Sequence, residues 1–186
     1  MKKFFSSIYP VQEHILDEYI DHWSEYEVTR KTIMTAPGDT ERFIYFVIEG
    51  IQKSYYQIGD KQHIIAFAYP PSFSGIPESF FTQSPSKYFL ETLTDSKFMR
   101  LPFTIHEQLM KEHREIETLF RKATEFFLAG VIERHHELMA FDIESRFKNF
   151  VRRSPHLLNM IPQKDLASYL RIDPTNFSKM MNSIKI

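Results

Sequence analysis

The spacing of hydrophobic residues changes twice along the chain, from helical to strand-like and back to helical. Between Val11 and about Tyr26 the apolar residues recur at helical steps, which predicts a short N-terminal helix. From Glu27 to Phe73, runs of β-branched and aromatic residues alternate with Gly, Pro and Asp, a pattern typical of antiparallel strands joined by tight turns. The segment Tyr88–Pro102 adds one or two further strands.

After Pro102 the pattern is helical for the rest of the chain. The predicted helices are Phe103–His113, Arg114–Phe141, Asp142–Val151 and a short pair within Pro162–Ile186. The change near residue 103 is therefore the main architectural boundary. We expect an α+β fold in which an N-terminal antiparallel β-roll is followed by a long helix and a small helical C-terminal domain.

The long helix carries an apolar stripe that can be interpreted in two ways. Its members recur at three- and four-residue steps, and they are Ile116, Leu119, Ala123, Phe126, Phe127, Gly130, Val131 and Leu138, with Phe120 widening the stripe. The stripe could pack against the β-roll of the same chain. Alternatively, it could form a parallel two-helix seam in a homodimer, where Ala123 and Gly130 would permit close approach.

The last 25 or so residues, "PQKDLASYLRIDPTNFSKMMNSIKI", fit a helix-turn-helix. The positions that such a unit buries are all apolar, namely Leu166, Leu170, Ile172, Phe177 and Met180, and the crossing point falls on the small Ala167. Asp173 is placed to cap the second helix, and Pro174 follows at its first position, where a missing N–H costs nothing. A chance helical hairpin is the alternative.

The outward side of the second helix is polar, with one cation. Short polar groups and a lysine suit hydrogen bonding to base edges and phosphates in the major groove. Arg171, in the turn, stands where glycine usually supplies a left-handed conformation, at a cost of about 1 kcal/mol. The candidate DNA-binding residues are Arg171, Pro174, Thr175, Asn176, Ser178, Lys179 and Asn182.

Composition supports a folded protein with an uneven charge. The chain is 42% hydrophobic and 15% aromatic, ample for a core, and it has a formal net charge of −1. Residues 142–186 nevertheless hold eight Lys/Arg against four Asp/Glu, so the C-terminal part is basic. This balance favours an anionic partner there, although it is also compatible with a solvated surface.

Several chemistries find no support in the sequence. No cysteine is present, which excludes disulfides, thiolate nucleophiles and Cys-ligated clusters and favours a reducing cytoplasm. Polar residues break the apolar N-terminal run at once, so we expect no export signal. We expect no membrane span either, because no window of the sequence approaches the roughly 18 apolar residues that a span requires. The adjacent pair His135-His136 points in different directions on a helix, and a lone His63 or His106 is more typical of a packed or surface residue than of a haem ligand. We therefore predict no catalytic residues and no metal site.

The order of these parts resembles the Crp/Fnr-type transcriptional regulators, particularly short members from Bacteroidetes-like bacteria. The likeness covers essentially the whole chain and is strongest in "YFVIEG" (Tyr45–Gly50) and "IPQKDLASYL" (Ile161–Leu170). It implies a cyclic-nucleotide-binding-like sensor domain, a double-stranded β-helix or jelly roll, at residues 1–112. It also implies a dimerisation helix at residues 113–141 and a helix-turn-helix DNA-binding domain at residues 142–186.

The resemblance does not extend to the family's phosphate cassette, which has a Gly-Glu and, about ten residues on, an Arg-Ser or Arg-Thr. In "FSGIPESFFTQSPSKYF", Gly75 is present, but isoleucine stands at the Glu position and Ser86-Lys87 at the Arg-Ser positions. Lys87 and Glu78 could act as displaced substitutes, with Tyr88 beside them, so these residues form the candidate effector pocket. We expect no response to cyclic AMP and no bound cofactor. Alternatively, the segment is a helical turn and loop that closes the roll without any ligand.

Three hypotheses about the function follow, each for a different class of protein. The favoured one is a homodimeric cytoplasmic regulator that binds double-stranded promoter DNA and, as the resemblance implies, contacts RNA polymerase. The second is a small-molecule-binding β-roll with a vestigial or truncated DNA-binding domain, because the sequence given stops at Ile186 with no strands left for a wing. The third is a cupin-like barrel enzyme, which would need several histidines and a carboxylate converging inside the barrel.

Overall fold

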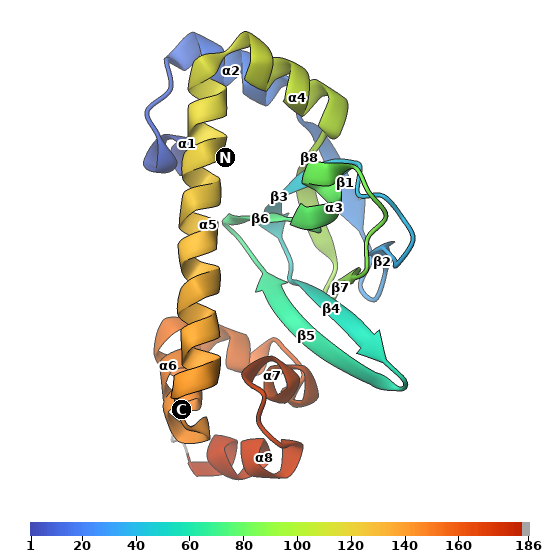
Figure 1. The fold of residues 1–186 in the computed structure, drawn as a ribbon, viewed down its shortest axis with the longest axis vertical. Helices are drawn as coiled ribbons and strands as arrows, with labels where there is room; N and C mark the ends of the chain where they lie inside the picture. The colour runs from blue at the N-terminus through green and yellow to red at the C-terminus, as the bar shows by residue number, and fades with distance from the viewer. Residues whose placement is uncertain (184–186) are drawn as a thin grey trace.

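The computed structural model describes residues 1–183 and divides into a β-roll, a long helix and a C-terminal helical domain (Figure 1). Two N-terminal helices, α1 (Lys2–Ile8) and α2 (Glu13–Asp21), pack beside the upper part of the long helix. The predicted helix between Val11 and Tyr26 was too long, because β1 already begins at Ser24. Helix α1 was not predicted.

Eight strands form the roll, as two antiparallel four-stranded sheets. The first sheet has the order β1-β8-β3-β6 and the second β2-β7-β4-β5. The strands are β1 (Ser24–Val28), β2 (Ile33–Thr35), β3 (Phe43–Glu49), β4 (Gln52–Ile58), β5 (Lys61–Ala68), β6 (Ser72–Ser74), β7 (Phe89–Thr92) and β8 (Ser96–Pro102). A short helix, α3 (Pro77–Thr82), lies between β6 and β7, in the segment where the cassette was considered. The predicted antiparallel β-roll is confirmed.

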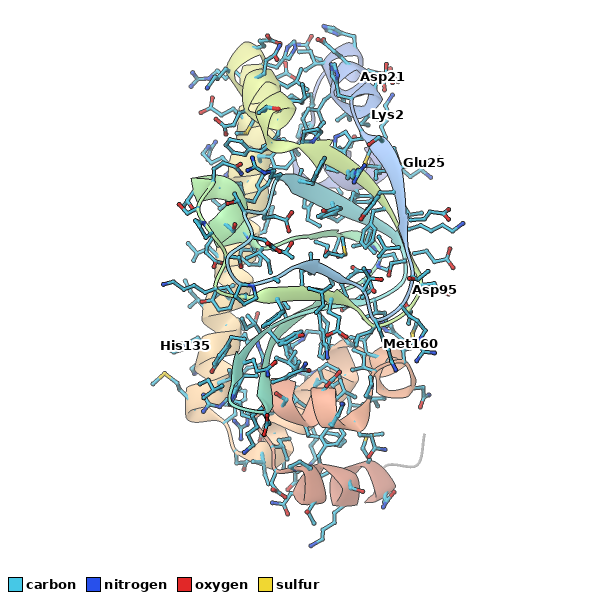
Figure 2. The ribbon with its side chains drawn as sticks, turned by 90° about the vertical axis from the view of Figure 1, so that its right-hand side faces the viewer. Lys2, Asp21, Glu25, Asp95, His135 and Met160 are labelled. Carbon is cyan, nitrogen blue, oxygen red and sulfur yellow. The ribbon has the colours of Figure 1, made fainter. Side chains whose placement is uncertain are left out.

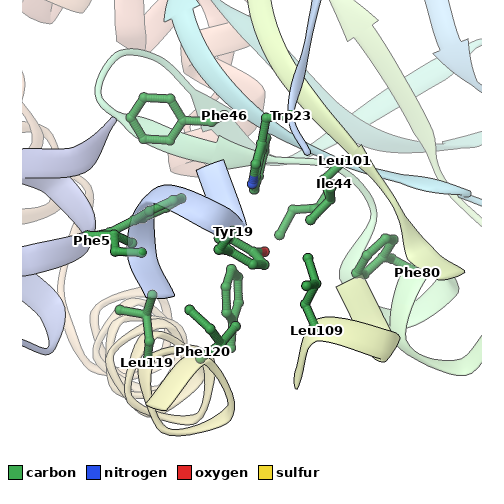
Figure 3. Close-up of a cluster of buried hydrophobic side chains, with 12 residues drawn as sticks. Phe5, Tyr19, Trp23, Ile44, Phe46, Phe80, Leu101, Leu109, Leu119 and Phe120 are labelled. Atoms are coloured by element: carbon green, nitrogen blue, oxygen red, sulfur yellow. The ribbon is translucent and has the colours of Figure 1, made fainter. Parts of the chain in front are cut away.

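The two faces of the first sheet belong to different cores, because side chains alternate along each strand. The inner face meets the second sheet, where Tyr45, Val47 and Phe98 pack with Leu90. The outer face meets α1, α2, α5 and α4 (Phe103–Glu112). This outer core is largely aromatic, as Figure 3 shows, and its buried members include Phe5, Tyr19, Trp23, Phe46, Phe80 and Phe120.

The turn between β3 and β4 requires glycine for two reasons. Gly50 has φ +93°, which L-residues with side chains rarely adopt. A Cβ placed there would lie 2.3 Å from Ser96 Oγ and 2.5 Å from the Asp95 carbonyl oxygen. The backbone of this turn can approach β8 closely only because position 50 has no side chain.

The long helix α5 (Arg114–Ala140) uses only part of its apolar stripe within the chain. Near its start, Ile116, Leu119 and Phe120 are buried in the outer core. Further along, Phe127 is 58% and Leu128 55% exposed, and the apolar side chains at positions 126, 131, 132 and 139 are exposed as well. His135 lies on the outer side of this helix (Figure 2). Packing within the chain therefore explains the first third of the stripe and leaves its middle uncovered.

The C-terminal domain consists of α6 (Ile143–Arg153), the 3-10 helix η1 (Pro155–Asn159), α7 (Gln163–Leu170) and α8 (Pro174–Ser183). Its core combines apolar residues of these helices with Ile51 of the roll. The predicted helices occur at the expected places, and only η1 was not anticipated. The expectation that no strands are left for a wing concerns the residues after Ser183, which lie outside the described part. No helix in residues 1–183 is both long and apolar enough to span a membrane.

Candidate nucleic-acid interface

Helices α7 and α8 form a compact two-helix unit around a small apolar core. Leu166, Ala167, Leu170, Ile172 and Phe177 are each at most 4% exposed, as their spacing predicted. The sixth predicted core residue, Met180, is half-buried at the edge of the cluster. The burial pattern places one side of α8 against α7 and leaves the other side outward.

The turn between the two helices is left-handed at a non-glycine residue. Arg171 has φ 53° and ψ 45°, and its N–H donates to the Ser168 carbonyl at 3.1 Å. The N–H of Ile172 donates to the Ala167 carbonyl at 2.9 Å, so the last carbonyls of α7 are satisfied. The left-handed conformation expected from the position of Arg171 is present, and it is held by these two hydrogen bonds.

Asp173 caps the second helix as its position predicted. Its Oδ1 accepts from the backbone N–H of Thr175 at 2.9 Å and from that of Asn176 at 3.3 Å. Pro174 follows as the first residue of α8. The cap and the proline fix where α8 begins, and therefore which side chains stand on its outer side.

The outer side of α8 is polar and exposed. Thr175, Asn176, Ser178, Lys179 and Asn182 are all exposed, as is Arg171 in the turn. In the part of the chain that the structure describes, no hydrogen bond engages their side chains. Helix α8 lies at the end of the molecule opposite α2 and α4 (Figure 1). These groups are thus available to a partner that approaches from that end.

Helix α7 is docked on the β-roll through a buried charge cluster. Lys53 of β4 places its Nζ 3.3 Å from Asp165 Oδ2 and 3.6 Å from Glu91 Oε2, and it donates to Gln62 Oε1 at 2.9 Å. The side chains of Lys53 and Asp165 are each 5% exposed. Because a buried charge without its partner is costly, this cluster fixes α7 against the sheet.

A second polar contact lies at the outer strand of the same sheet. Strand β5 is at the edge of its sheet, and α7 lies beside it. The Ser168 hydroxyl donates to the Gln62 carbonyl at 3.0 Å and accepts from the Ile64 N–H at 3.1 Å. One side chain of α7 thus satisfies both a donor and an acceptor of the exposed strand edge.

The end of α5 also contacts the C-terminal domain. The guanidinium carbon of Arg134 lies 3.4 Å from the centroid of the Tyr169 ring, and Arg134 also donates to the Tyr169 carbonyl. Burial lowers the pKa of Arg134 from its usual value. Arg153 of α6 pairs with Glu137 of α5 at 3.1 Å. The outward helix α8 is therefore part of a body that is fixed to both the roll and α5.

The candidate effector residues lie on the segment between β6 and β7 and differ in exposure. Glu78 and Lys87 are exposed, and Tyr88 is half-buried. Gly75, with φ +141°, lies between β6 and α3. Ile76, at the position of the family's glutamate, is 2% exposed and packs between the two sheets.

Ser86 is held by the roll's own backbone. Its carbonyl accepts from the Gly38 N–H at 2.9 Å, and its N–H donates to the Asp39 carbonyl at 2.8 Å. Its hydroxyl donates to the Tyr88 carbonyl and accepts from the Tyr88 N–H, each at 2.9 Å. These bonds join two loops of the roll. This arrangement is the one expected if the segment closes the roll, which was the alternative to an effector pocket.

The two single histidines considered for haem have ordinary packing roles. His106 is fully buried in the outer core, where Nδ1 lies 2.9 Å from the Tyr19 hydroxyl. Burial lowers the pKa of His106 to about 4, so its ring is neutral near pH 7. His63 stacks on Tyr56 with ring centroids 4.8 Å apart.

Reasoning from the sequence missed the residues that fix α7 to the roll. Lys53 stands within a strand of otherwise uncharged residues, which signals that a cation in this sheet needs a partner. Its partner Asp165 is 112 positions away in the chain. No local pattern links the two, so only the tertiary structure could identify the pair.

Structural comparison shows that the fold is that of known regulators. FixK2 from Bradyrhizobium japonicum matches with a TM-score of 0.75 at 15% identity, over 86% of this chain and 83% of that one. A CooA variant from Carboxydothermus hydrogenoformans matches with a TM-score of 0.70 at 14% identity, over 90% and 78%. A protein from Eubacterium rectale assigned to the Crp/Fnr regulators matches with a TM-score of 0.72 at 12% identity, over 95% and 86%.

No family model matches the sequence, and no curated protein sequence does. At these identities the structural likeness shows the fold and leaves individual residues to be argued from this chain's own geometry.

Proposed function

We propose that this protein is a homodimeric DNA-binding transcriptional regulator of Crp/Fnr type, with no enzymatic activity, in which α8 reads the major groove of promoter DNA. The observation that carries the proposal is the outer side of α8: five exposed polar side chains without partners among the described residues, on a helix fixed by a cap and a left-handed turn. The similarity of the fold to known regulators supports it.

The uncovered middle of α5 supports the homodimer. Exposed apolar side chains there include Phe126, Phe127, Leu128, Val131 and Ile132, between 47% and 64% exposed. A contiguous apolar surface of this kind on a helix is typical of a protein interface. A second copy of α5 running parallel would cover it and would place two α8 helices at the same end of the dimer.

The proposal includes no response to cyclic AMP. A cyclic phosphate needs a guanidinium, and the ribose hydroxyl needs a carboxylate, but the corresponding positions hold Ser86, bound to loop backbone, and the buried Ile76. We expect millimolar cyclic AMP to leave the melting temperature unchanged, whereas a ligand at 100-fold its Kd would stabilise by about 2.7 kcal/mol. A regulator of this type would act in the cytoplasm and contact RNA polymerase.

In-vitro selection of DNA bound by the purified protein tests the proposal. A symmetric dimer with two reading helices about 34 Å apart should select palindromes whose half-site centres are about 10 base pairs apart. Recovery of unrelated, non-palindromic sequences would contradict it and would favour the small-molecule module with a vestigial DNA-binding domain.

Lys179→Ala separates sequence reading from charge attraction. Its side chain is the cation on the outer side of α8, so we expect its loss to weaken specific binding by about 1 to 3 kcal/mol and to relax preference at one position per half-site. Lys111→Ala is the matched control, because Lys111 is 78% exposed on α4, at the opposite end of the molecule. Equal binding by both variants, with normal melting curves, would show that α8 does not read DNA.

A further inference from the structure

A row of polar side chains crosses the inner face of the first sheet. Arg100 of β8 is paired in register with Tyr45 of β3, and Tyr45 is paired in turn with Ser74 of β6. Residues directly opposite one another on adjacent strands point to the same face of a sheet. Tyr45 belongs to the core between the two sheets, so Arg100 and Ser74 also point into the roll.

Arg100 is a half-buried cation that lies against two aromatic rings. Its guanidinium carbon lies 4.1 Å from the centroid of the Tyr26 ring and 4.7 Å from that of Phe43. Its Nε is buried and has no hydrogen-bond partner within residues 1–183. Arg100 also takes part in none of the ion pairs of the described chain. The rings contribute a cation–π attraction but supply no negative charge.

The neighbours of Arg100 in this row are also hydrogen-bond donors. The hydroxyl of Ser74 is buried without a partner in the described part of the molecule, and so is that of Ser72 on the same strand. Burial raises the pKa of Tyr45 well above its usual value, so its hydroxyl stays protonated and can donate. A buried donor left unsatisfied costs about 1 to 3 kcal/mol, which makes several of them on one face of a sheet unusual.

We propose that Arg100, Tyr45 and Ser74 form a binding site inside the roll for the carboxylate of a small organic molecule. A carboxylate is planar and accepts two parallel N–H bonds, which matches the guanidinium fork. One cation balances one negative charge, whereas a phosphate monoester would bring close to two into a largely apolar interior. The aromatic walls suit a ligand whose remaining part is apolar.

This site differs from the sequence-based candidates. Glu78 and Lys87 are exposed on the segment between β6 and β7, whereas Arg100 lies on β8 and faces the interior. The proposal does not depend on DNA binding, because it concerns only groups of the β-roll. Its failure and the failure of the DNA-binding proposal are therefore measured separately.

Isothermal titration of the full-length protein tests the site with three probes: benzoate, the neutral benzamide and phenyl phosphate. We expect benzoate to bind and benzamide not to bind. Arg100→Met should weaken benzoate binding by roughly 10- to 100-fold, because hydrogen bonds to a charged group are lost. Arg100→Lys keeps the charge without the fork, so its loss should be smaller. The matched control is Arg30→Met, which removes an exposed arginine from a turn.

Ser74→Ala gives a readout that does not depend on the fold tolerating a change at Arg100. Removing a buried hydroxyl without a partner should leave the melting temperature of the free protein unchanged or higher, while benzoate affinity falls by about 3- to 10-fold. Benzoate binding that is unchanged in Arg100→Met, or no benzoate binding at millimolar concentration, would overturn the proposal. Tighter binding of phenyl phosphate than of benzoate would overturn the assignment to a carboxylate.

Discussion

The charge cluster between α7 and the roll predicts that loss of its cation destabilises the fold more than loss of one of its carboxylates. Lys53 lies between two carboxylates, with Asp165 at 3.3 Å and Glu91 at 3.6 Å, and Glu91 is 16% exposed. Lys53→Met would leave two largely buried carboxylates without their cation. Asp165→Asn would leave a neutral Lys53–Glu91 pair, and the amide oxygen could still accept a hydrogen bond from the lysine.

The expected magnitudes follow from burial. Removing one partner of a buried ion pair typically costs about 3 to 5 kcal/mol, which we expect for Lys53→Met. Weakening one charged hydrogen bond while charge balance remains should cost about 1 to 2 kcal/mol, which we expect for Asp165→Asn. The double variant should lose about 1 to 2 kcal/mol less than the sum of the single losses, because both changes remove one interaction.

Urea denaturation at fixed protein concentration measures these differences, provided that the slopes with denaturant agree among the variants. Lys97→Met is the control, because Lys97 pairs with Glu27 at 3.1 Å on the surface, with side chains 54% and 68% exposed. Its loss should be small, because solvent screens an ion pair on the surface. Two results would refute the reasoning: a Lys53→Met loss no larger than that of the control, or equal losses for Lys53→Met and Asp165→Asn.

Three further predictions concern the turn at Gly50, the buried histidine and α5. Gly50→Ala should destabilise the folded protein by about 2 to 5 kcal/mol in the same urea titration, because the new Cβ would lie 2.3 Å from Ser96 Oγ. The control Gly59→Ala, at a position with φ +56° and open space around it, should cost only about 1 kcal/mol. His106 has a folded pKa of about 4 and an unfolded one near 6.5, so the unfolded chain binds the proton first and stability falls as pH drops from about 6.5 to 4; thermal melts of His106→Asn should lack this component of the slope. Phe127→Glu places a charge on a side chain that is 58% exposed in one chain, so light scattering should show monomer while the circular dichroism spectrum is unchanged; a dimer that persists would place the interface elsewhere.

Most of the secondary structure could be predicted because the hydrophobic period is itself the signal. Helix α7 begins at Gln163 and α8 at Pro174, as the apolar spacing and the Asp173 cap indicated. Helix α1 escaped prediction because its seven residues contain two serines, and only Phe5 is fully buried. The first strand was read as the end of a helix, since Trp23 and Tyr26 continue the helical spacing although Tyr26 is paired with Phe98 in the sheet.

The outward residues of α8 could likewise be named from the sequence, since a capped helix with one buried side leaves the other side defined. The row of polar side chains on the inner face of the first sheet could not be predicted from the sequence. Arg100 in "SKFMRLP" gives no sign that it faces inward, because that depends on the register of β8 between β1 and β3. Register is set by pairing between strands far apart in the chain, which a single sequence does not reveal.

The hydroxyl of Ser168 helps to protect the protein from self-association through an exposed strand edge. Strand β5 is an outer strand, and bare strand edges recruit other strands into intermolecular sheets. Helix α7 shields this edge, so any event that detaches the C-terminal domain exposes the Gln62 carbonyl and the Ile64 N–H together with the apolar Ile65 beside them, which is already 38% exposed. Solubility of the β-roll is therefore linked to attachment of the C-terminal helices, and proteolytic removal of residues 142–186 should convert the remainder into a species that self-associates through β5.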